Sequence, residues 1–372
     1  MYRHTYLQVD CLKYRNNLKK IMKLNNKYEY FIGVVKNNCY HHGLYLVRIM
    51  KEMGINYFAV SSIEEALDVR KYDVDTPILC LEPVNSEYVF DAINNNITLT
   101  ISSAEEAMEI VNLKLSDTLK IHFKVDSGMN RLGFKSKESL KSAYDLLVKQ
   151  KNVVVEGVYT HFTTDGCTDK YYDIQVNNFL DITSLINLKD IPVVHVDRSY
   201  TSLIHPKHEF ANGFRIGLSM YGYLPQISKK FDTRNILSLN LKPVLSLYSE
   251  VISLRNVSKG EFVGYNAKYK PKKNAVIATI PCGYADGVSL DFKYVYINNK
   301  KYNIVAECMD MTMVEVDDEI KVGDKVEIFG QNQSAKELAS RLKIIDHKFL
   351  NLFSNRVPIV YLDEKSLFEV KY

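Results

Sequence analysis

The chain has 372 residues, 46% of them hydrophobic and 25% charged, a balance typical of a globular protein large enough for two domains. Its net charge of +4 argues against the concentrated basic face that nucleic-acid binding requires, and it is compatible with a small anionic ligand. The six scattered cysteines include no C-x-x-C pair, and no apolar run is long enough to cross a bilayer, so we expect a cytoplasmic protein without disulfides or a metal site.

Short β-branched runs alternate with helix-like segments through the first 220 residues. The runs cover residues 31–35, 57–61, 77–81, 98–102, 120–125, 153–162, 193–197 and 215–220. The segments between them have helical periodicity, and Ser62 and Ser103 occupy positions typical of helix N-caps. The alternation predicts an α/β fold, a (β/α)8 TIM-type barrel over residues 1–235. A doubly wound open sheet is the alternative, and the absence of G-x-G-x-x-G and G-K-[ST] motifs weakens its nucleotide-binding version.

The pattern changes after about residue 235, where alternating runs with turn signals replace the strand–helix rhythm. Examples are AVIATI, YVYINNKKYNIVAE and KVEIFG, and turn signals include Asn298-Asn299 and Gly323-Asp324. Only the stretch AKELASRL has a plausible helical pattern. We therefore predict a C-terminal, mostly β domain over residues 236–372.

Polar residues fall at or near the ends of the predicted barrel strands. They are Lys36, Lys124, Arg131, His161, Ser199 and Arg215. Chemistry in such a barrel lies at the C-terminal ends of the strands, so most of these side chains should meet at one rim; Arg215, at the start of its run, fits less well. Each residue alone has an ordinary structural explanation, such as a solvated lysine or a core histidine. Their joint placement favours a small-molecule site.

Lys36 stands in the segment FIGVVKNNCYHHG, where a strand ends in Val-Lys and a Tyr-x-His-Gly turn follows. This segment resembles the lysine segment of the alanine racemase family. The resemblance continues in the family's order through KVDSGMNRLGF, EGVYTHF, FRIGLSMYG, VGYNAKY, IPCGYADG, ECMDMTMVEV and NRVPIV, and it covers nearly the whole chain. It implies an amino-acid racemase that carries pyridoxal 5'-phosphate (PLP) as a Schiff base on Lys36.

The resemblance also implies two catalytic bases. Lys36 would be one base, and Tyr265 in VGYNAKY would be the other, on the opposite face of the substrate. Racemisation removes a proton from one side and delivers it to the other, which two opposed bases achieve. In this family the tyrosine comes from the β domain of the partner subunit, so the resemblance implies a homodimer with shared active sites.

Further roles are implied for residues around the cofactor. Arg215 would face the pyridine nitrogen, and His161 would link Arg215 to Tyr265 by hydrogen bonds. Arg131 would reach the phenolic oxygen of the cofactor and the substrate carboxylate, and Lys124 matches a lysine that is carbamylated in many members of the family. The residues expected at the phosphate are Tyr40, Ser199, Gly217 and Leu218. The substrate pocket is expected to include Arg131, Tyr284, Met309, Asp310 and Asn355.

Asn355 departs from the family pattern, because alanine racemases usually have a tyrosine there, beside the cofactor phosphate and the substrate side chain. The smaller amide leaves room for a hydroxymethyl group and can hydrogen-bond its hydroxyl, which favours L-serine over L-alanine, with activity on both. This asparagine resembles the vancomycin-resistance serine racemases, which supply D-serine for peptidoglycan and are cytoplasmic domains of membrane-bound proteins. A housekeeping alanine racemase is the alternative, with Arg198 beside Ser199 replacing the lost phosphate contact.

Two other classes compete. A PLP-dependent decarboxylase of the same barrel fold is disfavoured by Arg215, because a carboxylate would be expected at that position. A PLP-carrier protein would lack the β domain that contains Tyr265. We interpret Cys282, Cys308 and His195 as packing or structural residues.

Overall fold

The computed structural model describes residues 2–164, 166–167, 169–224, 229, 232, 234–364 and 366–369. The chain divides into two compact units, which we call the barrel unit and the sheet unit. The barrel unit comprises Arg15–Cys39 and Leu44–Lys242, and the sheet unit comprises Met1–Tyr14, Tyr40–Gly43 and Pro243–Tyr372. Two short segments near the N-terminus therefore belong to the sheet unit, whereas the prediction, with its single boundary at residue 235, assigns them to the barrel domain.

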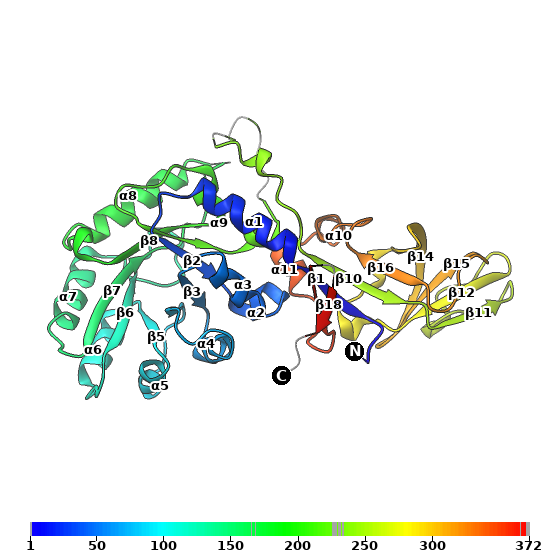
Figure 1. Ribbon diagram of the computed structural model, residues 1–372, viewed down its shortest axis with the longest axis horizontal. Helices are drawn as coiled ribbons and strands as arrows, with labels where there is room; N and C mark the ends of the chain where they lie inside the picture. The colour runs from blue at the N-terminus through cyan, green and yellow to red at the C-terminus, as the bar shows by residue number, and fades with distance from the viewer. Residues whose placement is uncertain are drawn as a thin grey trace. The chain divides into compact units, whose positions relative to one another are not determined.

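Eight parallel strands close into the barrel, with helices on the outside (Figure 1). The strands are β2 (Tyr30–Val34), β3 (Tyr57–Val60), β4 (Ile78–Cys80), β5 (Ile97–Ile101), β6 (Leu119–Lys124), β7 (Val153–Tyr159), β8 (Val193–Arg198) and β9 (Gly213–Ile216). The helices are α1 (Cys11–Leu24), α2 (Lys36–His41), α3 (Leu46–Glu52), α4 (Ile63–Arg70), α5 (Val89–Asn94), α6 (Ala104–Asn112), α7 (Lys137–Leu147), α8 (Tyr171–Thr183) and α9 (Ser199–Ile204). Each predicted run overlaps one of these strands, and their closure into a barrel confirms the (β/α)8 fold.

Local signals account for several of these boundaries. The side chains of Ser62 and Ser103 accept hydrogen bonds from the backbone N–H groups three residues later, so both predicted N-caps are confirmed. The last strand is shorter than predicted, because β9 ends at Ile216 and a 3-10 turn, η3, covers Leu218–Tyr221. Arg215 is consequently near the C-terminal end of its strand and not at its start.

The sheet unit contains ten strands in the order β11-β12-β15-β14-β13-β16-β10-β1-β17-β18. Their bounds are β1 (Tyr6–Asp10), β10 (Leu245–Glu250), β11 (Ser253–Val257), β12 (Ala275–Ile280), β13 (Tyr294–Ile297), β14 (Lys300–Glu307), β15 (Thr312–Val316), β16 (Lys325–Phe329), β17 (Ile359–Asp363) and β18 (Ser366–Glu369). Two short helices, α10 (Ala335–Arg341) and α11 (Asp346–Leu350), complete the unit. The mostly β character predicted for this part of the chain is confirmed.

Strand β1 is an interior strand of this sheet, although the sequence pattern assigns its residues to the barrel domain. It pairs antiparallel with β10 and parallel with β17. Leu7 and Val9 are fully buried on one face of the sheet, as the alternating pattern of the strand requires. The N-terminal strand therefore joins two C-terminal strands of the unit.

Two kinds of feature are absent from the described residues. None of the helices within them is both long and apolar enough to span a membrane. Nor do they contain three His, Cys, Asp or Glu side chains grouped closely enough to hold a metal ion.

Candidate active site

Lys36 lies at the C-terminal end of barrel strand β2 and begins α2, a turn with unusual backbone geometry. The five residues that follow it, Asn37 to His41, have φ between +49° and +65°, so the turn is left-handed. Such a conformation costs non-glycine residues roughly 1–2 kcal/mol each, with asparagine among the most tolerant. Specific contacts must offset this cost, and one is the hydrogen bond from the Asn37 N–H to Glu65 Oε1 at 2.7 Å.

The pKa of the Lys36 amine is lowered from its ordinary value. Burial is the main cause, and the positive charge of Arg131 adds to it, while Glu65 and Glu82 oppose the shift. Its neutral form is therefore more accessible than that of a solvated lysine. A neutral amine is nucleophilic and can also accept a proton.

Lys124 ends strand β6 and is only 5% exposed. Its Nζ lies over the ring of Tyr159, 4.6 Å from the centroid. Burial, followed by the charges of Arg215 and Arg131, holds the pKa of Lys124 well below its usual range. The residue predicted to be modifiable is thus a buried and readily deprotonated amine.

His161 follows strand β7 and lies in a strongly cationic environment. Burial lowers its pKa well below the usual value, and the charges of Arg215, Lys124, Arg198 and Arg131 lower it further. His161 is therefore neutral at pH 7. The barrel end that carries these groups would attract an anionic ligand.

Arg215 is buried inside the barrel, and its hydrogen bonds differ from the predicted ones. One guanidinium nitrogen donates to His195 Nδ1 at 2.6 Å and to the His195 carbonyl at 2.8 Å. The other donates to the carbonyls of Thr160 at 2.6 Å and Val196 at 3.2 Å. Among the described residues its imidazole partner is thus His195, whereas we expected His161.

The contacts of His195 continue across the barrel interior. His195 Nε2 lies 3.0 Å from His122 Nδ1, and His122 Nε2 lies 3.3 Å from Glu156 Oε2. The sequence interpretation missed all three residues as parts of the site. A signal was present for His122, which stands two residues before Lys124 in one strand and so shares its face.

Ser199, Gly217 and Leu218 form a small group of donors at the ends of β8 and β9. Ser199 begins α9, and its hydroxyl accepts the Gly217 N–H at 2.6 Å. The neighbouring Ser219 hydroxyl is buried and has no hydrogen-bond partner among the described residues. An unpartnered buried hydroxyl beside the backbone N–H groups of a tight turn fits a phosphate dianion. These residues therefore fit the phosphate of PLP, and the neutral amine of Lys36 fits its aldehyde.

Of the remaining predicted residues, Arg131 is an exposed residue of the barrel unit, after β6, whereas the others belong to the sheet unit. Tyr40 lies in the left-handed turn, with its ring centroid 6.2 Å from that of His347. Tyr265 begins the 3-10 turn η6 (Tyr265–Ala267), and its side chain is 71% exposed. The turn is held close to strand β14, because a Cβ atom on Gly264 would approach the Ala306 Cβ to 2.5 Å.

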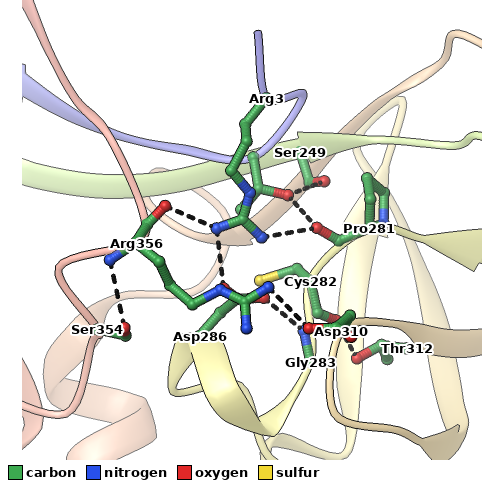
Figure 2. Close-up of polar contacts among 11 residues, drawn as sticks. Arg3, Ser249, Pro281, Cys282, Gly283, Asp286, Asp310, Thr312, Ser354 and Arg356 are labelled. Atoms are coloured by element: carbon green, nitrogen blue, oxygen red, sulfur yellow. Dashed lines mark hydrogen bonds and ion pairs between the residues drawn. The ribbon is translucent and has the colours of Figure 1, made fainter.

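Tyr284, Asp310 and Asn355 lie on three separate loops that meet at one buried carboxylate. Asp286 belongs to the same 3-10 turn as Tyr284, η7 (Tyr284–Asp286), and its side chain is completely buried. Figure 2 shows the guanidinium groups of Arg3 and Arg356 directed toward it, with nitrogen–oxygen distances of 2.9 and 3.1 Å.

This ion-pair cluster also fixes the backbone of the neighbouring loops. Arg356 forms a second ion pair with Asp310 at 2.7 Å, and Arg3 donates to the Arg356 carbonyl at 2.8 Å. The N–H of Ser354 donates to the Asp286 carbonyl at 3.3 Å. Both chain neighbours of Asn355 are therefore bonded to the cluster.

Met309 is tied to the same turn from the other side. The N–H groups of Tyr284 and Ala285 donate to the carbonyls of Cys308 and Met309, at 3.1 and 3.0 Å. Gly283 allows this approach, because a Cβ there would lie 2.3 Å from the Cys308 carbonyl oxygen. The cluster and these bonds together bring all the predicted substrate residues of the sheet unit into one group.

Comparison with known proteins gives a consistent result. The alanine racemase N-terminal domain model matches residues 9–225, and the alanine racemase C-terminal domain model matches residues 244–361. Alanine racemase 1 of Bacillus subtilis is 32% identical over 379 residues, which cover 100% of this chain and 96% of that protein.

Solved structures agree. Alanine racemase of Clostridium difficile 630 superposes with a TM-score of 0.92 at 31% identity, over 100% of this chain and 99% of that one. A histidine racemase of Leuconostoc mesenteroides superposes with a TM-score of 0.84 at 26% identity, over 97% and 99% of the two chains. Proteins named for different substrates thus share this fold.

Proposed function

The chain belongs to the alanine racemase family of PLP-dependent amino-acid racemases, and we propose that it interconverts L- and D-alanine. The observation that supports this most is the partly buried Lys36 amine, with its lowered pKa, after β2, the strand that pairs with β9 and so with the strand that leads into Gly217 and Leu218. Alanine is favoured over the predicted serine because the two more similar relatives reported above, from Bacillus subtilis and Clostridium difficile, carry the name alanine racemase.

In this proposal Lys36 holds the cofactor through a covalent bond to Nζ. Bound PLP supplies the electron withdrawal that allows the α-proton of an amino acid to leave. Once the substrate amine has displaced Lys36 Nζ from the cofactor, the freed Nζ would remove or deliver that proton on one face of the substrate, and a partner subunit's Tyr265 hydroxyl would do so on the other. Burial, and then the neighbouring positive charges, lower the pKa of His161 and favour its neutral form, so it can exchange hydrogen bonds without adding charge.

Arg215 would present donors to the pyridine nitrogen of the cofactor. A guanidinium has no acceptor and does not release its proton at neutral pH, so it disfavours protonation of that nitrogen. An unprotonated ring withdraws electrons less strongly, which limits side reactions such as transamination. Ser199, Gly217, Leu218, Tyr40 and Asn355 would hold the phosphate end.

We also propose that Lys124 is carbamylated. Its neutral Nζ would attack the carbon of carbon dioxide and lose one proton, giving a carbamate that accepts hydrogen bonds from Arg131. The lowered pKa of Lys124 and the nearby charge of Arg131 support this modification. Protein equilibrated with 13C-bicarbonate should show a carbamate signal that Lys124→Met abolishes.

A homodimer would supply Tyr265 to each site. The loops that carry the proposed second base and substrate residues expose large apolar side chains, a feature of surfaces that bind a partner. These are Phe262, Tyr265, Tyr284, Met309 and Met311. Mixing Lys36→Ala subunits with Tyr265→Phe subunits should restore part of the activity, and a mixture as inactive as either variant would contradict shared sites.

Serine is the second candidate substrate, and Asn355 is the residue that favours it. Its short amide could hydrogen-bond a substrate hydroxyl, and both of its chain neighbours are fixed by the ion-pair cluster. Exchange of the α-proton in D2O should be compared for L-alanine and L-serine in the wild type and in Asn355→Tyr. Faster exchange of serine in the wild type would replace the alanine proposal, and Asn355→Tyr should then shift the preference toward alanine.

The proposal as a whole is tested by Lys36→Ala. This variant should lose the visible absorbance of a lysine-bound pyridoxal group, and its racemase activity should fall by roughly a thousandfold or more. Lys189→Ala, which changes an exposed lysine of the same unit, is the matched control. Retention of the absorbance band by Lys36→Ala would reject the assignment.

A further inference from the structure

Glu156 is a carboxylate of the barrel interior that none of the proposed catalytic roles uses. Its side chain is 14% exposed. Oε2 accepts hydrogen bonds from the hydroxyls of Tyr57 at 2.6 Å and Thr98 at 3.1 Å, and Oε1 lies 3.3 Å from Lys120 Nζ. The fourth neighbour, His122, connects Glu156 through His195 to Arg215.

The hydrogen bond between Glu156 and His122 can have only one direction, from the imidazole as donor to the carboxylate as acceptor. Burial raises the pKa of Glu156, but the hydrogen bonds from His122 and from the Tyr57 hydroxyl favour the ionised form, and the pKa is lowered to about 2. An ionised carboxylate only accepts hydrogen bonds, so His122 Nε2 must carry the proton. Burial lowers the pKa of His122, so the ring is neutral and its Nδ1 is an acceptor.

The second half follows from the first. His195 Nε2 must donate to His122 Nδ1, 3.0 Å away. Burial and the charge of Arg215 hold the pKa of His195 well below its usual value, so this ring is neutral too. Its Nδ1 is then an acceptor for the Arg215 guanidinium at 2.6 Å. Every hydrogen bond from Arg215 to Glu156 therefore runs in the same direction.

The strands are built to hold these rings. The register of β6 against β7 shifts at His122, so that Glu156 is an extra residue in β7, and the register of β8 against β9 shifts after His195, so that Val196 is extra. Bulges of this kind re-aim side chains in barrels. Gly157 leaves space for His122, because a Cβ there would lie 2.5 Å from the imidazole ring.

The His195 ring is also fixed by stacking. It lies parallel to the Tyr159 ring, with an interplanar angle of 7° and a centroid distance of 4.7 Å. The Tyr159 hydroxyl is in turn bonded to Thr100 at 2.9 Å. The imidazole therefore cannot turn without breaking this stack.

We propose that Glu156 is a positioning residue, which acts through His122 and His195 to hold the Arg215 guanidinium in one orientation toward the cofactor ring. Asp197 favours the charged form of Arg215, so that charge does not depend on Glu156. The role of Glu156 is to fix the direction of the hydrogen bonds that run through His122 and His195. If His122 took the opposite tautomer, His195 would carry its proton on Nδ1 and oppose an Arg215 N–H with another donor. The guanidinium would then have to turn away. This inference rests on the proposed function only for what Arg215 does.

The direction of the hydrogen bonds between Arg215 and Glu156 can be measured by NMR of the wild-type protein labelled with 15N-histidine. Two-bond correlations distinguish the Nε2–H from the Nδ1–H tautomer of a neutral imidazole. His122 and His195 should both be Nε2–H, with signals assigned from His122→Asn and His195→Asn. A wild-type His122 or His195 with its proton on Nδ1 overturns the proposal without any need for a folded Glu156 variant. Tyr57→Phe, which keeps the carboxylate, should leave the proton on Nε2 in both His122 and His195.

Glu156→Gln tests the consequence. The glutamine amide can present either its oxygen, an acceptor, or its NH2 group, a donor, to His122. His122 and His195 should therefore each become a mixture of the Nε2–H and Nδ1–H tautomers. Because Arg215 does not touch the substrate in this proposal, kcat should fall by roughly tenfold or more while KM changes by less than about twofold. Glu109→Gln, an exposed glutamate of the same unit, should leave both unchanged.

The two proposals fail in different ways. A wild-type protein that shows both Nε2–H tautomers but never acquires the pyridoxal absorbance would contradict the proposed function and leave the hydrogen-bond chain intact. A wild-type racemase whose tautomers and kcat are unaffected by Glu156→Gln would overturn the positioning role alone.

Discussion

Two carboxylates, the partly buried Glu156 of the barrel unit and the fully buried Asp286 of the sheet unit, reach their arginines in different ways. Two neutral imidazoles separate Glu156 from Arg215, whereas Asp286 is in direct contact with Arg3 and Arg356. Arg215 is only 3% exposed, while the side chains of Arg3 and Arg356 are 28% and 43% exposed.

The difference matches what each arginine has to do. Arg3 and Arg356 hold loops together, so direct pairing with Asp286 is the most effective arrangement, and partial hydration reduces its desolvation cost. A carboxylate in direct contact with Arg215 would cancel the positive charge that an anionic ligand meets. In the barrel the carboxylate therefore acts at a distance, through groups that carry no charge.

The largest effect on stability should come from Asp286→Ala. Removing this carboxylate leaves two guanidinium groups without their shared partner, so we expect the free energy of unfolding to fall by about 3 kcal/mol. Urea denaturation measures this change, with the exposed Asp291→Ala as the matched control. A loss below about 1 kcal/mol would mean that the cluster does not hold the loops together.

Acid should reveal the barrel carboxylate. The pKa of Glu156 is lower in the folded than in the unfolded protein. Its contribution to the free energy of unfolding is therefore fully present above the unfolded pKa near 4.5, and it is lost as the pH falls toward about 2. The loss between these values should be roughly 2–3 kcal/mol, and Glu156→Gln should remove it. Identical acid denaturation of the two proteins would show that Glu156 is not stabilised in its charged form.

The buried histidines add a second, earlier acid effect. The pKa values of His122, His161 and His195 are all lowered by burial, so each gains a proton in the unfolded chain before it does in the folded one. Stability should therefore begin to fall as the pH drops below about 6.5. Urea titrations between pH 7.5 and pH 5 would detect this slope, and a flat profile would contradict the neutral imidazoles.

The smallest effect should come from Arg356→Ala. Because this side chain is 43% exposed, its loss should lower the free energy of unfolding by only about 1 kcal/mol. It should nevertheless change the ratio of alanine to serine turnover, since Arg356 adjoins Asn355. Arg255→Ala, in the exposed part of β11, serves as the control. An unchanged ratio would mean that the ion-pair cluster has no influence on the choice between alanine and serine.

The barrel was predictable because its strands are short, mainly apolar runs, most of them buried on both sides and bounded by helical segments. Strand β1 was not, because nothing in residues 6–10 identifies its partners, β10 and β17, far along the chain. Similarly, the sequence identifies Lys36 and Arg215 through their motifs. The link from Arg215 to His195 depends on barrel closure and on a register shift that follows His195, neither of which has a local signal.

Strand β1 has a consequence for how the protein folds as it is synthesised. Its partner strands β10 and β17 leave the ribosome long after it, so at roughly 5–20 residues per second Leu7 and Val9 wait on the order of ten seconds or more. Meanwhile the barrel strands can close among themselves, because their pairs are formed between near neighbours, apart from the final β2–β9 contact. Until β10 and then β17 emerge, the two edges of β1 therefore remain unpaired, which makes the order of synthesis a hazard for aggregation.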